Sequence, residues 1–279
     1  MKYYAQTLLP LLLLSGLTSS LTGCSTIRRQ LGQALITDET EIQLGTKLAT
    51  EIEANQKIHA DHSLQTYIQH VADPLITNAL ADRPNIRYNI KVIDDPKQIN
   101  AFAVPGGFLY VNSGFLLTAQ DEAEIAGILA HEIGHIVGRH SANQLAAQFG
   151  IDLIIGITLG EDPLQLGQIA GQLSGARFSR DDENEADRYG VKYTVAADYD
   201  PRGLIDFFAK LKKMENSRPS DLEKLFASHP PTGERIKHIE KLIAKYDAGG
   251  GQRHQARFLQ ATANLRRAHS SASSENGRK

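Results

Sequence analysis

His131-Glu132-Ile133-Gly134-His135 stands near the middle of an apolar stretch that runs from Glu122 to about Phe149. The stretch predicts one long helix. On a helix, residues four apart lie one above the other, so both imidazoles project toward one point and can supply two nitrogen ligands to a zinc ion. Glu132 lies a quarter turn away, where a carboxylate can take a proton from an attacking water. The pattern indicates a zinc hydrolase, most simply a peptidase.

A catalytic zinc site needs a third protein ligand and keeps a fourth position open. His140 is one candidate, because Gly138 stands where the pattern H-E-x-x-H-x-x-G-x-x-H has its glycine. That pattern places its last histidine at position 141, which is Ser141. At about 100° per residue, His140 lies about 180° around the helix from His131. We therefore expect His140 to be a surface or core histidine rather than a ligand.

A better third ligand lies in the acidic segment 179–187. Glu183 and Asp187 are four apart and share one helix face, whereas Glu185 points to the opposite side. One carboxylate can bind the metal while the other orients a histidine N–H. The alternative is a solvated acidic helix start with Ser179 as its N-cap. Because zinc must find its third ligand somewhere, the metal-binding interpretation is favoured.

Glycines also mark the pentad helix. Those that fall next to the two histidines in projection are Gly127, Gly134 and Gly138. A glycine stripe lowers helix propensity, so it suggests that another backbone approaches closely. We expect the acidic helix to pack there through its own small residues, Ala186 and Gly190.

The remaining patterns predict an α+β fold that is mainly helical. Ile86 to Val92 alternates apolar and polar residues, which is typical of a half-buried strand. Residues 100–104 and 108–111 are interpreted as two short strands joined by a Pro-Gly-Gly turn. Helices are expected at 38–52, at 64–76 with a kink or break at Pro74, at 179–196, at 201–215 and at 233–246. We therefore expect a zincin-type metallopeptidase domain with a small mixed β-sheet packed on the pentad helix.

Two segments near the site have more than one interpretation. Pro105 ends the first of the two strands, as expected at a sheet edge, and extended peptides commonly add to such an edge. The candidate substrate-binding residues are Asn100, Ala101, Phe102 and Ala103. The alternative interpretation is that this strand only completes the sheet beneath the helix. The apolar segment 151–175 is a lid, a plug or a membrane-facing surface, with ordinary core helices as the default, and its run 151–159 is too short to span a bilayer.

The N-terminal residues 1–23 are predicted to be an export signal. Leu21-Thr22-Gly23-Cys24 resembles a bacterial lipobox, so Cys24, the single cysteine, is the expected lipidation site; the alternative is an ordinary cleaved signal with an incidental cysteine. We expect a tether at 24–37, the metallopeptidase domain at 38–247, and a glycine linker with a basic, disordered tail at 248–279. The net charge of -2 gives no electrostatic argument for a nucleic-acid partner.

Further motifs occur in a fixed order between Asp38 and Tyr246. Beside the pentad they are Glu41-Ile42-Gln43-Leu44-Gly45, the segment 100–107, Phe178-Ser179-Arg180 with Glu183 and Asp187, Ser228-His229-Pro230-Pro231-Thr232, and Glu234-Arg235-Ile236. In these motifs the chain resembles the HtpX- and CAAX-prenyl-protease-related zinc metallopeptidases (gluzincins), in particular their soluble periplasmic BepA- and LoiP-like members. The resemblance implies His131, His135 and Glu183 as ligands of one zinc ion, Glu132 as catalytic base and Asp187 as a supporting acid.

The same resemblance implies that His229 lies near the active site. It either stabilises the oxyanion or occupies the open zinc position and holds the enzyme latent; a helix-entry residue before Pro230 is the third interpretation. Arg235 or a tyrosine is a less favoured oxyanion stabiliser. Ser25, rather than an aspartate, follows Cys24, and by resemblance to sorted lipoproteins this implies an outer-membrane lipoprotein that faces the periplasm.

These features predict a zinc endopeptidase that is anchored by its lipid and hydrolyses unfolded or misassembled envelope proteins as part of protein quality control. The alternative is a periplasmic chaperone or assembly factor for outer-membrane proteins, with weak or latent protease activity. A third hypothesis, a structural lipoprotein with incidental motifs, predicts no bound zinc.

Overall fold

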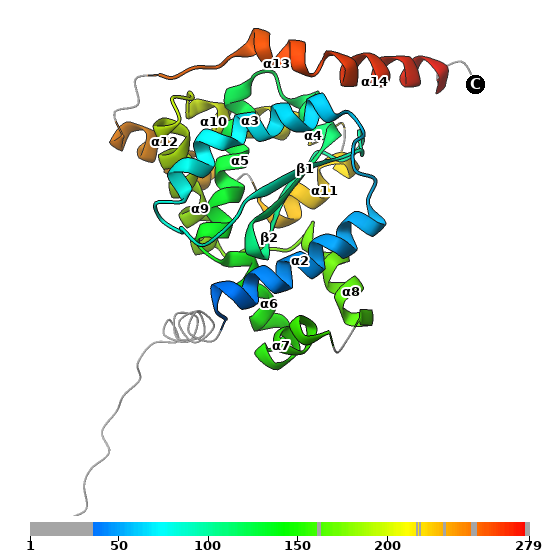
Figure 1. The fold of residues 1–279 in the computed structure, drawn as a ribbon. Coiled ribbons are helices and arrows are strands. Elements are labelled where there is room, and N and C mark those ends of the chain that lie inside the picture. The colour runs from blue at the N-terminus through cyan, green and yellow to red at the C-terminus, as the bar shows by residue number, and fades with distance from the viewer. Residues whose placement is uncertain are drawn as a thin grey trace, which may run out of the picture.

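The computed structural model describes residues 36–160, 163–215, 217, 219–230, 233–246 and 250–276 (Figure 1). The predicted signal peptide, Cys24 and nearly all of the predicted tether lie outside these residues. The first half of the fold consists of α2 (Asp38–Asn55), α3 (His62–Ala79), β1 (Asn89–Ile93), β2 (Ala101–Val104), the short 3-10 turn η1 (Pro105–Gly107), β3 (Phe108–Asn112) and α4 (Ser113–Thr118). The second half consists of α5 (Glu122–Val137), α6 (His140–Phe149), α7 (Ile151–Leu159), α8 (Pro163–Leu173), α9 (Arg180–Ala196), α10 (Arg202–Met214), α11 (Pro219–Ser228), α12 (Gly233–Lys245), α13 (Gln255–Ala261) and α14 (Ala263–Asn276).

The three strands form one small mixed sheet in the order β1-β3-β2, with β3 in the middle. β1 runs parallel to β3, and β2 runs antiparallel to it, joined by the Pro-Gly-Gly turn. Gly106 in that turn has a φ of 78°, a conformation that glycine adopts without steric cost. The structure confirms a mainly helical α+β fold with a small mixed sheet, and β2 lies at its edge as predicted.

The sheet separates two hydrophobic cores, because successive side chains of a strand point to opposite faces. Leu109 and Val111 of β3 belong to the larger core, together with apolar residues of α3, α5 and α10. Tyr110, between them, belongs to the smaller core with residues of α2 and α7. In Figure 1, α5 lies on one side of the sheet and α2 on the other. The sheet and its two cores therefore fix the position of α5, which carries the pentad.

The prediction of one helix over 122–149 is wrong. α5 ends at Val137, Gly138 caps it, and Arg139 takes a left-handed conformation with φ 59° before α6 begins. A left-handed residue with a side chain costs about 1–2 kcal/mol. The Arg139 side chain offsets this cost, because its Nε lies 2.9 Å from Oε2 of the buried Glu41 and its Nη2 donates to the carbonyl of Ile36.

Of the other helical regions, one prediction is corrected, one helix was missed and one segment takes its default interpretation. α3 runs continuously over His62–Ala79 with Pro74 inside it, so Pro74 does not break the helix. α11 was not predicted. The segment 151–175 folds as α7 and α8, and Ile154 and Ile157 of α7 are buried in the smaller core, as expected of core helices, whereas Leu159 is 70% exposed.

The expectation of a disordered tail is wrong for residues 250–276, which we call the C-terminal strap. The strap forms α13 and α14, which lie along one edge of the fold in Figure 1. Phe258 is fully buried in the larger core, and Arg257 pairs with the buried carboxylate of Glu122, the first residue of α5. Arg266 donates to the carbonyls of Leu116, Leu117 and Ala119 at the end of α4.

Within the described ranges, no single helix is long and apolar enough to cross a membrane. α6 and α7 together reach the required length and hydropathy, but they meet at a bend of 106°.

Candidate metal centre

α5 and α9 bring the two halves of the centre together through their small residues. A Cβ added to Gly134 would lie 2.9 Å from the carbonyl oxygen of Ala186, and one added to Gly190 would lie 3.3 Å from Cα of His131. Side chains at these positions would push the two helices apart. The predicted packing is therefore observed for Gly134, Ala186 and Gly190. The other two glycines of the stripe serve different neighbours: Gly127 faces Leu204 of α10, and Gly138 faces His140.

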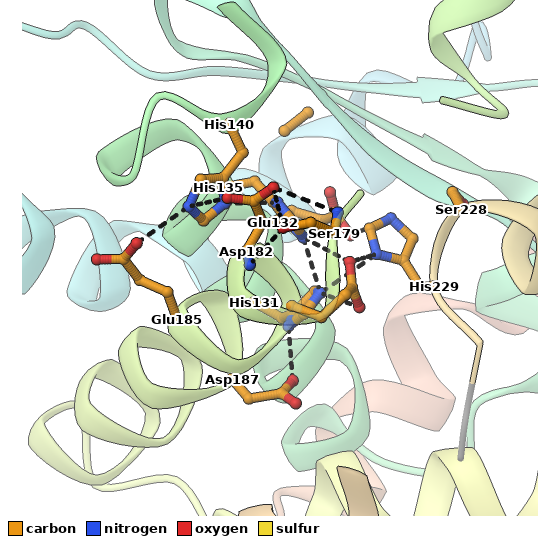
Figure 2. A network of polar contacts seen from close by, with 12 residues as sticks. His131, Glu132, His135, His140, Ser179, Asp182, Glu185, Asp187, Ser228 and His229 are labelled. Atoms are coloured by element: carbon orange, nitrogen blue, oxygen red, sulfur yellow. Dashed lines mark hydrogen bonds and ion pairs between the residues drawn. The ribbon is translucent and has the colours of Figure 1, made fainter. Parts of the chain in front are cut away.

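Four buried side chains converge between these helices: His131, His135, Glu183 and His229. One ligand atom of each lies within 4.8 Å of the others. Figure 2 shows the three imidazoles turned toward a common centre, with His229 entering from the segment after α11.

The spacing of these atoms fits one metal ion. Nε2 of His131 lies 3.1 Å from Nε2 of His135 and 3.4 Å from Nδ1 of His229, and Nε2 of His135 lies 3.3 Å from Oε1 of Glu183. Two ligands held about 2.0–2.1 Å from a tetrahedral ion lie roughly 3.3 Å apart. The group is therefore positioned to bind one metal ion, and its nitrogen and oxygen donors are consistent with zinc.

Glu132 is buried beside this group. Its Oε2 has no hydrogen-bond partner among the described residues, and its Oε1 lies 3.5 Å from Nε2 of His229. Burial raises the pKa of Glu132 above its ordinary value. The neighbouring His229 and His131 lower this pKa, but by less than burial raises it. A carboxylate with a raised pKa and a free lone pair is suited to accept a proton from a water at this centre.

Asp187 orients His131. Its Oδ1 lies 2.9 Å from Nδ1 of His131, so an N–H at Nδ1 donates to the carboxylate and leaves the Nε2 lone pair for the metal. Burial alone would raise the pKa of Asp187, but the Arg235 guanidinium and the hydrogen bond from His131 outweigh it and hold the pKa below its usual value. Asp187 therefore remains a carboxylate at neutral pH.

Arg235 of α12, the less favoured candidate for the oxyanion stabiliser, pairs with two carboxylates in the structure. Its guanidinium lies between two carboxylates, with Nη1 2.6 Å from Oε2 of Glu183 and Nη2 2.7 Å from Oδ1 of Asp187. Burial would raise the pKa of Glu183, but His229 and Arg235 hold it well below its ordinary value. The motif Glu234-Arg235-Ile236 marks this residue in the sequence, but nothing local indicates its partners 48 and 52 residues earlier.

The side chains of Phe178 and His140 contact the ring of His135. The ring of Phe178 stacks on the His135 ring with centroids 4.0 Å apart. His140 is not one of the four donors; it is a buried histidine whose Nδ1 lies 2.9 Å from Nδ1 of His135. His140 therefore lies behind the ligand and not at the metal.

The candidate substrate strand is covered in this structure. Asn100, Ala101, Phe102 and Ala103 are all buried. Ser141 of α6 donates to the Ala103 carbonyl over 3.0 Å, and the Asn100 side chain donates to the carbonyl of Ser174. An added peptide strand would need α6 or the segment before α9 to shift away from this edge.

Comparisons with known proteins agree with this geometry. The chain is 28% identical over 218 residues to the beta-barrel assembly-enhancing protease of Yersinia pestis, covering 73% of this chain and 44% of that protein. It is 32% identical over 179 residues to metalloprotease YcaL of Escherichia coli strain K12, covering 61% of this chain and 68% of the relative. It is also 30% identical over 174 residues to metalloprotease LoiP of the same strain, covering 59% and 66%.

The aligned part spans less than half the length of the beta-barrel assembly-enhancing protease. The family model named Peptidase family M48 matches residues 62–243, which include the pentad, Glu183, Asp187, His229 and Arg235. The chain therefore belongs to peptidase family M48.

Proposed function

We propose that this protein is a zinc-dependent endopeptidase that hydrolyses unfolded or misassembled proteins of the bacterial envelope. The observation that carries the proposal is the position of Glu132, a buried carboxylate with an unpartnered oxygen beside a group of three histidines and Glu183. The names of the relatives, which include a beta-barrel assembly-enhancing protease, support envelope proteins as the substrate class.

Each side chain of the metal centre has a role in the proposed hydrolysis. When bound, zinc supplies Lewis-acid activation of the scissile carbonyl and of water. His131, His135 and Glu183 would hold the ion, and Asp187 fixes the His131 ring through Nδ1. Glu132 takes a proton from the attacking water and delivers it to the leaving amine. Burial of all these side chains excludes bulk solvent and strengthens their electrostatic interactions.

Two roles are proposed for His229, a metal ligand of the resting enzyme and a stabiliser of the oxyanion. Its Nδ1 lies 2.8 Å from Oε1 of Glu183, within the donor group, which suits a ligand that fills the fourth position of a resting enzyme. Burial lowers the pKa of His229, but Glu183 and Glu132 raise it above the ordinary value, which suits a cation that stabilises an oxyanion. The covered β2 edge, together with the position of His229 within the donor group, supports a latent resting state. A latent resting state is also consistent with the chaperone alternative.

Metal analysis and cleavage of casein by wild-type protein and Glu132→Gln, measured in parallel, test the proposal. We expect about one zinc per chain in both proteins and cleavage by the wild type only, because the amide cannot accept the proton. Wild-type protein that folds without taking up zinc would overturn the metal centre. Envelope function that survives in cells expressing Glu132→Gln would favour the chaperone alternative.

The proposed location rests on Cys24, the single cysteine, which follows a lipobox-like sequence. We propose that its lipid anchors the protein to the outer membrane, facing the periplasm. Labelling with radioactive palmitate and membrane fractionation should show lipid on the wild type and none on Cys24→Ser. Unlabelled wild-type protein in the soluble fraction would remove the anchor from this proposal.

A further inference from the structure

The helix break between α5 and α6 places His140 against a metal ligand. An uninterrupted helix would carry this side chain to the far side of the axis from His131. The left-handed Arg139 instead turns the chain, so that Nδ1 of His140 lies 2.9 Å from Nδ1 of His135. Gly138 makes room for this arrangement, because a Cβ there would lie 2.3 Å from Nε2 of His140. The helix break and Gly138 therefore both permit the contact between His140 and His135.

The chain of contacts continues from His140 to α9. Nε2 of His140 lies 3.3 Å from Oε2 of Glu185 and 3.6 Å from Oδ1 of Asp182. The other carboxylate oxygen of Glu185 accepts from Nη2 of Arg188 over 3.0 Å. Figure 2 shows Glu185 reaching His140 from the side opposite His135. His135 and His140 are both buried, whereas Glu185 is partly exposed and Arg188 is exposed.

The donors and acceptors of this chain have one consistent assignment when His135 binds the ion. His135 faces the donor group with Nε2, whose lone pair goes to the metal, so its proton lies on Nδ1. That N–H can donate to His140 only if Nδ1 of His140 carries a lone pair. The proton of His140 then lies on Nε2 and donates to Glu185. In this assignment each of the two rings carries a single N–H.

We propose that His140 and Glu185 are positioning residues that fix the tautomer and ring orientation of His135 and thereby set the affinity of the centre for zinc. In this arrangement each metal-binding histidine of the pentad has its own support from α9. Asp187 acts directly on His131, and Glu185 acts on His135 through the ring of His140. The inference rests on the metal centre of the proposed function, but not on any particular substrate.

Zinc affinity of the full-length protein, measured by competition with a chromophoric chelator, tests the proposal. We expect His140→Leu to raise the Kd for zinc by about 10–100-fold, the usual effect of removing a group that orients a metal-binding histidine. His140→Gln should recover most of the affinity, because its amide can accept from His135 and donate to Glu185. Glu185→Ala should weaken zinc binding in the same direction as His140→Leu.

The control variant separates positioning from general loss of packing. Leu48→Ala opens a cavity in the smaller core, so it should lower thermal stability while leaving the Kd for zinc unchanged. A Kd for His140→Leu equal to that of the wild type would overturn the proposal, as would an equal rise in Kd for Leu48→Ala. Failure of the wild type to bind zinc would instead overturn the metal centre, and with it the proposed function.

A measurement on the wild type keeps the test independent of whether variants fold. Nitrogen-15 NMR of the zinc-loaded, histidine-labelled protein reports which ring nitrogen carries each proton. We expect His135 protonated at Nδ1 and His140 protonated at Nε2. A His140 ring protonated at Nδ1, or at both nitrogens, could not accept from His135 and would overturn the assignment.

Discussion

Arg235 and Asp187 form a buried, two-pronged ion pair, with Nε and Nη2 of the arginine each 2.7 Å from a different carboxylate oxygen. The same carboxylate accepts from His131, and the same guanidinium reaches Glu183. One arginine therefore neutralises both acids of α9 that face the metal centre. Its planar fork matches carboxylate geometry, which a lysine ammonium cannot reproduce.

Removing this arginine should strongly destabilise the fold. Arg235→Ala leaves two buried carboxylates without their counter-charge, and breaking a buried pair in this way costs about 3–5 kcal/mol. Zinc should restore part of the loss, because its charge balances Glu183. Urea unfolding with EDTA and with zinc measures both effects. Arg180→Ala is the control, because its ion pair with Glu234 is exposed and worth about 0–1 kcal/mol. Equal losses in the two variants would contradict the interpretation.

His229→Ala should separate the two tasks proposed for His229. Because its Nδ1 lies within the donor group, we expect the variant to bind zinc more weakly and to cleave casein faster than the wild type. Zinc affinity by chelator competition and initial rates of cleavage are the measurements. Unchanged affinity with a large fall in cleavage would assign His229 to the oxyanion instead. Unchanged zinc affinity together with unchanged cleavage kinetics would exclude both roles for His229.

The C-terminal strap should contribute to the stability of the metallopeptidase fold. Phe258 is fully buried, and truncating such a side chain to alanine costs about 3–5 kcal/mol. Phe258→Ala should therefore lower the free energy of unfolding by that order, as measured in urea. Leu259, its 44% exposed neighbour, supplies the control, and Leu259→Ala should change stability little. A negligible effect of Phe258→Ala would mean that the strap does not dock in solution.

The strap also predicts a pH dependence through Asp200. Burial raises the pKa of Asp200, but its contacts with Arg202 and Arg253 outweigh burial and hold the pKa below the ordinary value. The folded state therefore favours the ionised form. Its contribution is present above the unfolded pKa of about 3.9 and is lost as pH falls through the folded pKa.

Asp200→Asn should consequently destabilise the protein at pH 7, and the difference from the wild type should shrink toward pH 3. Urea unfolding in EDTA at both pH values checks this, since EDTA removes any contribution from the metal. Asp73→Asn, at an exposed carboxylate of α3, should show little difference at either pH. A difference in the free energy of unfolding between Asp200→Asn and the wild type that is larger at pH 3 than at pH 7 would contradict the predicted direction of the pH dependence.

Local patterns were sufficient for much of the fold and for the candidate ligands. The three-strand sheet followed from period-two alternation and the Pro-Gly-Gly turn, and α9 followed from its N-cap, where Ser179 and Asp182 form a capping box. The acidic helix start and the candidate ligand Glu183 were weighed as alternatives, and the structure contains both. The capping carboxylate and the candidate ligand are adjacent residues on the same turn.

The features that were missed depend on contacts distant in sequence. Arg139 is left-handed because Glu41, 98 residues earlier, pairs with it, and no local rule predicts a helix break there. The strap is basic and serine-rich, which resembles a disordered tail. Phe258 nevertheless packs in the larger core, and Arg257 pairs with Glu122, 135 residues earlier. Composition describes a segment alone, whereas these partners exist only after the chain has folded.

The groups of the metal centre are spread widely along the polypeptide, from His131 on α5 to Arg235 on α12. During synthesis, α5 exists long before the arginine that neutralises its neighbouring acids has been added. A nascent chain that ends before α12 therefore lacks the guanidinium that pairs with Glu183 and Asp187. The proposed hydrolysis therefore requires a chain that has been synthesised at least as far as α12.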